Sequence, residues 1–233
     1  LSNQLEKSGN WLFKYRSYLP LLIIPFLLYL ITLNKQIDLF NLLVLSGICI
    51  SFFGQVIRIY TIAYVPFGTS GRNTEQQKAN SLNKLGVYSL VRNPLYIGNF
   101  FMYIGPFILS GNIYGIIIFI LIFTLYYERI IYAEESYLKS KFSEDYNEWS
   151  SKTPIIIPSM KNFKQNISRF NFKKVIYSEY SGFCAMILTF ISIVYFKNYY
   201  FDIKPYLGYQ CEIIFYINVF LYFIIRIFKK YKS

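Results

Sequence analysis

The chain has 233 residues, of which 55% are hydrophobic and 15% are charged. Soluble domains average about 45–50% apolar and about 25% charged residues, so this composition excludes a disordered chain and favours a protein partly surrounded by lipid. Twenty-four Lys and Arg against 12 Asp and Glu give a net charge of +12, which favours an anionic neighbour such as lipid, nucleic acid or an acidic substrate.

Uncharged stretches bounded by charged residues predict the first membrane spans. Residues 17–34 and 39–57 are each close to the roughly 20 residues that cross the hydrocarbon core of a bilayer at a rise of about 1.5 Å per residue. We expect both stretches to form membrane helices, and the second helix to continue to Tyr64.

Residues 93–127 form an uncharged stretch that is too long for one ordinary span. Turn-forming residues interrupt it near its middle: Gly105, Pro106, Gly111, Asn112 and Gly115. The stretch therefore predicts a helical hairpin.

Residues 180–196 and 205–225 predict one or two further spans, the last of which contains Glu212. Together these elements predict an all-α, polytopic integral membrane protein with five or six transmembrane helices.

The distribution of Lys and Arg predicts the orientation of these spans. Nineteen of the 24 lie in residues 1–16, 66–94, 132–180 and 226–233, whereas the loops on the opposite side hold only Lys35, Lys197 and Lys204. Loops rich in Lys and Arg stay in the cytoplasm, so we expect both termini and the two longest loops on that side. Much of the +12 then reflects orientation and attraction to anionic leaflet lipid.

The absence of histidine excludes several kinds of site. Without imidazole the chain has no Ser-His-Asp triad, no histidine zinc ligand and no histidine general base. Cys49, Cys184 and Cys211 lie far apart and form no CxxC motif, so we expect no metal site and no disulfide framework. We interpret all three cysteines as apolar filler.

The segment from Gly86 to Gly98 lies just before the predicted hairpin and has features of an anion site. Pro94 suits the first turn of a helix, where its missing N–H costs nothing. Arg92 and Asn93 precede it at the membrane boundary, beside free backbone donors. An arginine at a helix N-terminus readily binds an anion. The alternative is an arginine that marks the cytoplasmic edge of the membrane.

A second polar cluster follows the return arm of the hairpin. Glu128 and Glu135 are seven residues apart and so share a helical face, and Glu134 lies beside Glu135. Because the two ends of a hairpin lie side by side, we expect these carboxylates to emerge near the level of Arg92. The alternative is a solvated helix face.

Together the two segments resemble the isoprenylcysteine carboxyl methyltransferase and phospholipid methyltransferase superfamily. Its pattern joins Gly-x-Tyr and Arg-His-Pro-x-Tyr-x-Gly to a later Glu-Glu-x-x-Leu, an aromatic-rich stretch and Val-Pro-x-x-Ile-Pro. The first part is matched by Gly86, Tyr88, Arg92, Pro94, Tyr96 and Gly98, and the second by Glu134, Glu135, Leu138, Phe142, Tyr146, Trp149, Pro154 and Pro158. The resemblance divides the chain into an N-terminal membrane helix (1–39), a methyltransferase-like core (40–158) and a C-terminal membrane extension (159–233).

The resemblance implies a methyltransferase that binds S-adenosylmethionine without a Rossmann domain, and the chain has no GxGxxG motif. It implies a cofactor site formed by Tyr88, Arg92, Pro94, Tyr96, Gly98, Glu134 and Glu135. Electrostatics suits that set, since the cofactor carries a carboxylate for an arginine and two cationic groups for a glutamate. Arg92, Asn93 and Glu135 are the residues that the resemblance places nearest the reaction.

Asn93 departs from the family pattern, which usually has histidine at that position. If the histidine only forms hydrogen bonds, an asparagine amide can replace it. If it removes a proton, activity requires a nucleophile that arrives already ionised, as a phosphate or carboxylate does at pH 7. The departure therefore favours O-methylation of an acid.

Residues 68–74 supply candidate groups for the methyl acceptor. They combine glycines and hydroxyls with Arg72 and Asn73, groups that suit an anionic lipid head group. An ordinary polar turn is the alternative. The loop is similar to that of bacterial members taken to methylate a lipid A phosphate, which implies an acceptor such as lipid A 1-phosphate at the cytoplasmic face of a bacterial inner membrane.

Two other functions are compatible with the same residues. Membrane sterol reductases have a similar Arg-His-Pro-x-Tyr segment but use NADPH, whose phosphates require additional arginines near the paired acids, where this chain has Arg129. An inactive membrane scaffold is the third possibility, suggested by Asn93. The abundant Tyr and Phe fit an interfacial belt better than a nucleic-acid surface, so we expect a lipid partner, and the sequence leaves the oligomeric state open.

Overall fold

The computed structural model describes residues 2–33, 40–66, 69, 77, 79–166, 168–202 and 208–231. Over these ranges the chain is helical and contains no strand, which confirms the predicted all-α class. The α-helices are α1 (Ser2–Tyr15), α2 (Ile23–Thr32), α3 (Phe40–Ala63), α4 (Val87–Leu90), α5 (Pro94–Leu109), α6 (Ile113–Lys152), α7 (Phe172–Tyr200) and α8 (Gly208–Tyr231). Two short 3-10 helices are η1 (Leu19–Leu22) and η2 (Met160–Asn162).

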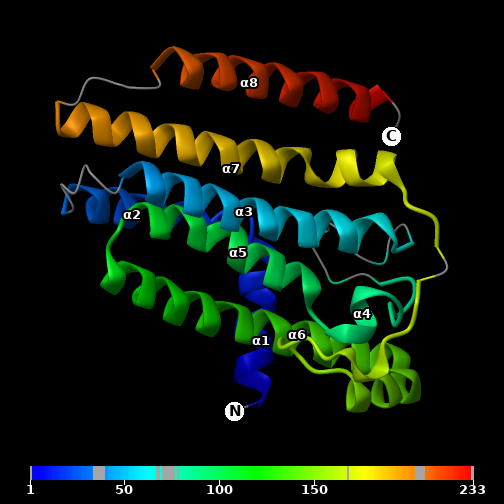
Figure 1. Cartoon of the computed structure of the whole chain (residues 1–233). Helices are drawn as coiled ribbons and strands as arrows, with labels where there is room; N and C mark the ends of the chain where they lie inside the picture. The colour runs from blue at the N-terminus through cyan, green and yellow to red at the C-terminus, as the bar shows by residue number, and fades with distance from the viewer. Residues whose placement is uncertain are drawn as a thin grey trace.

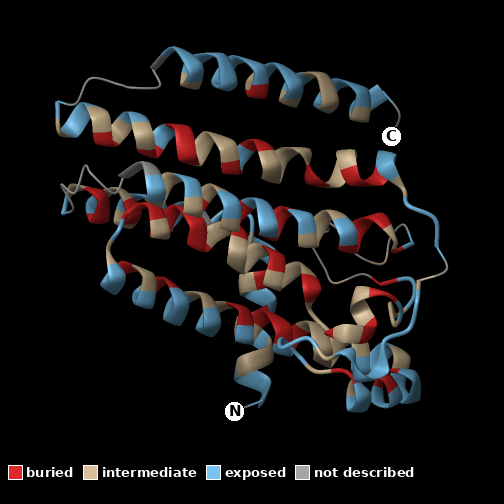
Figure 2. Ribbon diagram, in the orientation of Figure 1, coloured by how far each residue is buried: buried red, intermediate tan, exposed pale blue. Residues whose placement is uncertain are grey.

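Within the described ranges, four helices are long and apolar enough to cross a membrane: Leu42–Ala63, Ile113–Lys152, Phe172–Tyr200 and Tyr209–Tyr231. Two shorter apolar helices, α2 and α5, accompany them. All six run roughly side by side, whereas α1 crosses them (Figure 1). The surface of α8 is mainly exposed (Figure 2), as expected of an apolar helix that faces lipid. The chain is an integral membrane protein.

The first predicted span differs from the structure. Residues 17–34 contain η1 followed by α2, and α2 is only ten residues long. Pro25 is the third residue of α2, where its missing N–H is one of the four that a helix start leaves unpaired. The proline therefore favours a new helix start at Ile23 over one continuous helix.

The predicted hairpin is confirmed and consists of α5 and α6. Its turn lies at residues 110–112, where Gly111 has a φ of +64°, a conformation that costs glycine little. The Asn112 side chain caps α6 by accepting a hydrogen bond from Gly115 N at 3.0 Å. Gly105 and Pro106 lie inside α5.

Small residues bring α3 and α5 into close contact. A Cβ atom added to Gly54 would lie 2.5 Å from Gly98 O, and one added to Gly47 would lie 2.6 Å from Gly105 O. Between these two points Ser51 Oγ donates a hydrogen bond to Met102 O at 2.9 Å. Small residues of this kind allow membrane helices to approach closely. The contact fixes the start of α5, and with it the Arg92 segment, against α3.

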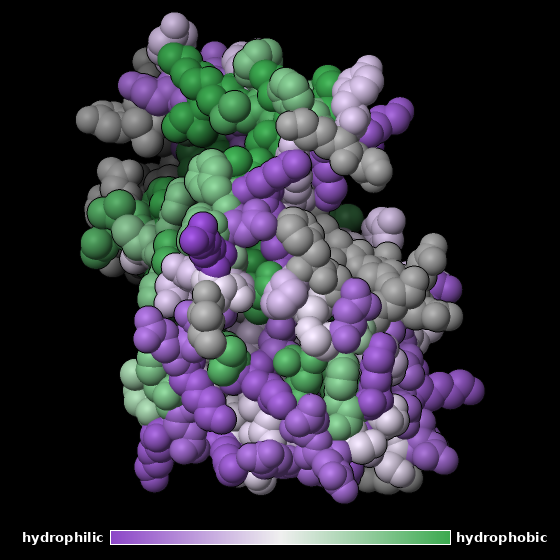
Figure 3. All heavy atoms as spheres, turned by 90° about the vertical axis from the view of Figure 1, so that its right-hand side faces the viewer, coloured by the Kyte–Doolittle hydropathy of each residue, from purple (hydrophilic) through white to green (hydrophobic). Residues whose placement is uncertain are grey.

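One end of the bundle is polar. The end of α3, α4, the start of α7 and the end of α8 lie together on the right-hand side of Figure 1. Seen from that side, much of the described surface is hydrophilic (Figure 3). The described parts of three of the segments rich in Lys and Arg, residues 79–94, 132–180 and 226–231, thus lie at this end, whereas α1 crosses the bundle near its middle. Among the cysteines, Cys184 is buried, whereas Cys49 is exposed on α3, an apolar helix long enough to cross a membrane.

Candidate functional site

A break in α6 folds its last turns back toward the hairpin. Ser143, with φ 41° and ψ −106°, is non-helical inside the 40-residue helix. The turns that follow contribute buried Tyr146 and Trp149. Trp149 Nε1 donates a hydrogen bond to Tyr88 O at 2.9 Å, which joins the end of α6 to α4.

The Arg92 segment is fixed by the strap that follows α6. Arg92 N donates to Pro154 O at 2.9 Å, and Ser159 N donates to Leu90 O at 3.0 Å. Gly86, with a φ of +60°, donates its N–H to Lys164 O at 2.8 Å. These backbone bonds hold residues 86–92 of the predicted motif beside the strap, residues 153–164.

Arg92, Asn93 and Glu135 meet as the hairpin geometry predicts. Arg92 Nη1 donates to Glu135 Oε2 at 2.8 Å, and Asn93 Nδ2 lies 3.3 Å from the other carboxylate oxygen. The Arg92 and Glu135 side chains are 14% and 20% exposed, so the ion pair is only weakly screened by solvent. Tyr146 Oη lies 3.4 Å from Arg92 Nη1 and completes the cluster.

Glu134 points to a different partner from its neighbour Glu135. Tyr96 Oη donates to Glu134 Oε2 at 2.6 Å, a short charge-assisted bond. The Tyr96 ring packs against Tyr127, with ring centroids 4.6 Å apart. The two adjacent acids therefore have separate positions: Glu135 holds Arg92, and Glu134 is held by Tyr96.

A cavity of about 950 Å³ lies beside this cluster. It is at the upper end of the roughly 300–1,000 Å³ typical of ligand pockets. Of the predicted site residues, its wall contains Tyr88, Arg92, Asn93, Pro94, Tyr96 and Glu134.

Two predicted cofactor residues lie outside the cavity wall. Gly98 faces α3, and a Cβ atom added to it would lie 2.5 Å from Arg58 Cγ, so its absence of a side chain serves helix packing. Glu135 is the second residue outside the wall, where it accepts a hydrogen bond from Arg92. Glu128, which shares its helical face, is exposed and takes no part in the cluster. Arg72 and Asn73 lie outside the described residues, although Thr69, Gln77 and Ala79, close to them in the chain, line the cavity.

The residues present suit S-adenosylmethionine. Arg92 Nε is buried and has no hydrogen-bond partner among the described residues, so it is a donor for a ligand carboxylate. Glu134 offers a carboxylate to a cationic group in the same cavity. Burial, together with the Glu134 carboxylate, raises the pKa of Tyr88 above its usual range, so its phenol stays protonated.

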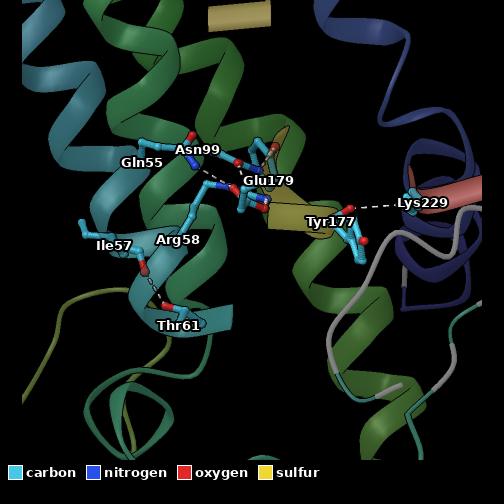
Figure 4. A network of polar contacts seen from close by, with 9 residues as sticks. Gln55, Ile57, Arg58, Thr61, Asn99, Tyr177, Glu179 and Lys229 are labelled. Atoms are coloured by element: carbon cyan, nitrogen blue, oxygen red, sulfur yellow. Dashed lines mark hydrogen bonds and ion pairs between the residues drawn. The ribbon is translucent and has the colours of Figure 1, made fainter. Parts of the chain in front are cut away.

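A second polar cluster in the cavity wall was not predicted from the sequence. Figure 4 shows Gln55, Arg58 and Asn99 gathered around Glu179. Arg58 directly follows the predicted span 39–57, and Glu179 directly precedes the predicted span 180–196. A charge at the edge of an apolar run is the signal that could have found them, since charges are costly in membranes and usually pair with each other.

Comparison with known proteins finds a family that the core of this site resembles. Residues 42–145 match the phospholipid methyltransferase family. This part of the chain, 104 of its 233 residues, is similar to that family. The phospholipid methyltransferase segment extends from α3 through the hairpin to just beyond the break in α6, and so includes Arg92, Tyr96, Glu134 and Glu135.

Similar proteins include two protein-S-isoprenylcysteine O-methyltransferases. The one from Schizosaccharomyces pombe is 33% identical over 108 residues, which cover 45% of each chain, and the one from Saccharomyces cerevisiae is 35% identical over 115 residues, which cover 48% of this chain and 47% of the relative. A nickel-cobalt-cadmium resistance protein from Alcaligenes xylosoxydans is 31% identical over 88 residues, or 38% of this chain and 41% of the relative. The chain thus spans about half or less of the length of these relatives. No solved structure is significantly similar to it.

Proposed function

We propose that this protein transfers a methyl group from S-adenosylmethionine to an anionic oxygen of a membrane lipid or lipidated substrate. The observation that carries the proposal is the cavity whose wall contains Arg92 and Glu134, with Arg92 fixed from behind by Glu135. A cation just before α5 and an anion on α6 match the opposite charges of this cofactor. The phospholipid methyltransferase match and the O-methyltransferase relatives support the same reaction class.

Arg92 binds the cofactor carboxylate, and Glu134 binds its ammonium group. Tyr88 and Tyr96, which line the same cavity, contact the adenosyl part. When bound, the cofactor supplies a sulfonium methyl, to which the acceptor oxygen forms a bond while the carbon–sulfur bond breaks and its electron pair stays on sulfur. The negative oxygen and the positive sulfur both become neutral, so no proton moves. Positioning by the cavity wall and exclusion of water are then the protein's main contributions.

Asn93 fits this reaction with an acidic acceptor. Its amide donates to Glu135 and, at 3.3 Å, to Ile155 O, so it helps to orient the acid that holds Arg92. An amide removes no proton near neutral pH. A phosphate or carboxylate needs no base, whereas an alcohol does. Lipid A 1-phosphate is one acceptor of this kind, and we propose that the site faces the cytoplasm of a bacterial inner membrane, the side that the Lys and Arg distribution favours.

Incubation with methyl-labelled S-adenosylmethionine and total membrane lipid tests the proposal. We expect label in the lipid fraction that mild base releases as methanol, readily from a carboxylate ester and more slowly from a phosphate ester. The Glu134→Gln variant should lose most of this label because it removes the anionic partner of the cofactor. Base-stable label would contradict O-methylation, and cofactor binding without transfer to any acidic lipid would support an inactive scaffold instead.

A further inference from the structure

Arg58 and Glu179 form an ion pair below the surface of the polar end. Arg58 Nε donates to Glu179 Oε2 and Arg58 Nη2 to Glu179 Oε1, both at 2.7 Å, which is a bidentate arrangement. Glu179 also accepts from Gln55 Nε2 at 3.0 Å. The side chains of Arg58 and Glu179 are 18% and 5% exposed. A buried ion pair is seldom worth more to stability than apolar packing, so its presence points to another use.

The guanidinium of Arg58 is held but not fully used. Its third bond in the described part of the chain runs from Nη1 to Asn99 Oδ1 at 2.6 Å. A guanidinium has five N–H groups. Three bonds therefore leave one N–H on each terminal nitrogen without a described partner, and guanidinium N–H groups suit a carboxylate or phosphate. Asn99 is itself oriented, because its Nδ2 donates to Tyr127 Oη at 2.9 Å.

This guanidinium lies in the wall of the cavity that contains Arg92. Arg58, Asn99 and Glu179 all line it, together with Tyr96 and Glu134. Arg58 therefore adds a further cation to a lining that also contains Arg92 and Arg16. The cavity thus has a place for an anion that is separate from the proposed cofactor carboxylate.

The depth of Arg58 suits a lipid head group. It stands five residues before the end of α3, which is roughly 7–8 Å at the rise of an α-helix, and Asn99 is five residues after the start of α5. Both helix ends lie at the polar end of the bundle (Figure 1). An anion at Arg58 would therefore lie just inside the membrane boundary, with its apolar part directed further in.

The face of α7 next to Glu179 leaves room for an apolar chain. The residues of α7 that line the cavity are mostly small: Ser178, Ser181, Gly182, Ala185 and Thr189. A Cβ atom added to Gly182 would meet nothing within 4 Å, whereas those on Gly47, Gly54, Gly98 and Gly105 would meet a neighbouring helix. Gly182 therefore does not serve helix packing but widens the cavity. Glycine in the middle of a helix destabilises the fold by about 0.5–1 kcal/mol relative to alanine. The stability of α7 therefore does not explain why residue 182 is a glycine.

From these observations we infer that Arg58, held by Glu179 and Asn99, binds the phosphate or carboxylate of an amphiphile whose apolar chain lies along α7 at Gly182. This amphiphile is the methyl acceptor, an identification that rests on the proposed function. Arg58 belongs to the family segment, but Glu179 and Gly182 lie beyond residue 145. The C-terminal extension therefore completes the acceptor site.

Binding of anionic amphiphiles to the full chain in a nonionic detergent tests the inference. The ligands are dodecyl phosphate and dodecanoate, with inorganic phosphate and dodecyltrimethylammonium as controls, and affinity is measured from the concentration dependence of the melting temperature. We expect one or both anionic amphiphiles to stabilise the wild type, and neither control to do so. Stabilisation by inorganic phosphate alone would assign the site to a free anion and overturn the inference.

Two variants locate the binding. Arg58→Gln combined with Glu179→Gln removes both charges together, and Gly182→Phe fills the space without touching the ion pair. We expect each to weaken amphiphile binding at least tenfold and to change S-adenosylhomocysteine binding less than twofold. Ser192→Phe, which adds the same ring to an exposed position of α7, should leave both affinities unchanged. If the double variant fails to fold, Gly182→Phe alone decides the result.

The outcomes separate this inference from the proposed function. Unchanged amphiphile affinity in the variants, with intact S-adenosylhomocysteine binding, would overturn the inference and leave the methyltransferase proposal standing. Amphiphile binding that the variants lose, in a wild type that binds no S-adenosylhomocysteine, would overturn the methyltransferase proposal and support the anionic amphiphile site alone.

Discussion

Arg92 Nη1 lies 2.8 Å from Glu135 Oε2, although 43 residues separate the two in the chain. The hairpin of α5 and α6 produces this contact, because its two ends emerge together at the polar end of the bundle. The pair orients the guanidinium whose Nε is buried without a partner among the described residues. The proposed cofactor site depends on this relationship.

Replacing Glu135 should weaken cofactor binding. In Glu135→Gln the guanidinium of Arg92 loses its counter-ion, and a hydrogen bond to a charged group contributes about 1.5–3 kcal/mol. We expect the Kd for S-adenosylhomocysteine, measured by calorimetry, to rise about 10–100-fold. Glu148→Gln is the control, since Glu148 is exposed and pairs only with Lys152 among its described neighbours. Equal affinities for the two variants would contradict the role given to Glu135.

Removing the hydroxyl of Tyr96 should also weaken cofactor binding, but less than replacing Glu135 does. Tyr96→Phe deletes the 2.6 Å bond to Glu134 but keeps the ring contact with Tyr127. We expect a rise of about tenfold in the same Kd, because Glu134 loses the group that orients it. Tyr132→Phe removes a hydroxyl from an exposed position of α6 and should change nothing. A wild-type Kd in Tyr96→Phe would show that Glu134 needs no orientation.

Much of the fold followed from the spacing of charges, and the site followed from a motif. The hairpin, the long spans and the meeting of Arg92 with Glu135 were predicted because helix geometry and turn residues determine them locally. The partnership of Arg58 with Glu179 could not be predicted, since it depends on how α7 packs against α3. The same holds for the break at Ser143, where the sequence carries neither glycine nor proline.

Asn93 provides a test of the acceptor chemistry through pH. If the acceptor is a phosphate or carboxylate, it already carries a negative charge at pH 6, so no side chain has to remove a proton from it between about pH 6 and pH 9. We expect a flat rate of methyl transfer over that range, and less than a threefold gain in Asn93→His. A rate that increases through a pKa near 6.5 only in Asn93→His would indicate an acceptor that needs a base.

Trp149 should matter more for stability than for chemistry. Its indole donates to Tyr88 O and joins the folded-back end of α6 to α4. Trp149→Phe leaves this carbonyl without its donor, which costs about 1–3 kcal/mol for a buried group. We expect a clearly lower melting temperature in detergent. Trp11→Phe, at a position that is 55% exposed, should melt like the wild type, and an equal decrease in both variants would contradict the account.

Two glycines should respond in opposite ways to added side chains. Gly54→Leu places a side chain where even a Cβ atom would lie 2.5 Å from Gly98 O, so α3 and α5 must separate, and we expect a loss of at least about 1–3 kcal/mol. Gly182→Ala meets nothing within 4 Å and should stabilise α7 by about 0.5–1 kcal/mol. Denaturation of the two purified variants, compared with the wild type, measures both changes. The same sign for both would contradict the packing described for α3 and α5.

The most direct test of the central claim is the thermal stability of the detergent-purified protein with S-adenosylhomocysteine or NADPH. The account predicts a concentration-dependent increase in melting temperature with S-adenosylhomocysteine, reduced in Glu134→Gln and Glu135→Gln, and no increase with NADPH. Stabilisation by NADPH alone would contradict the account and favour a reductase of the sterol-reductase kind.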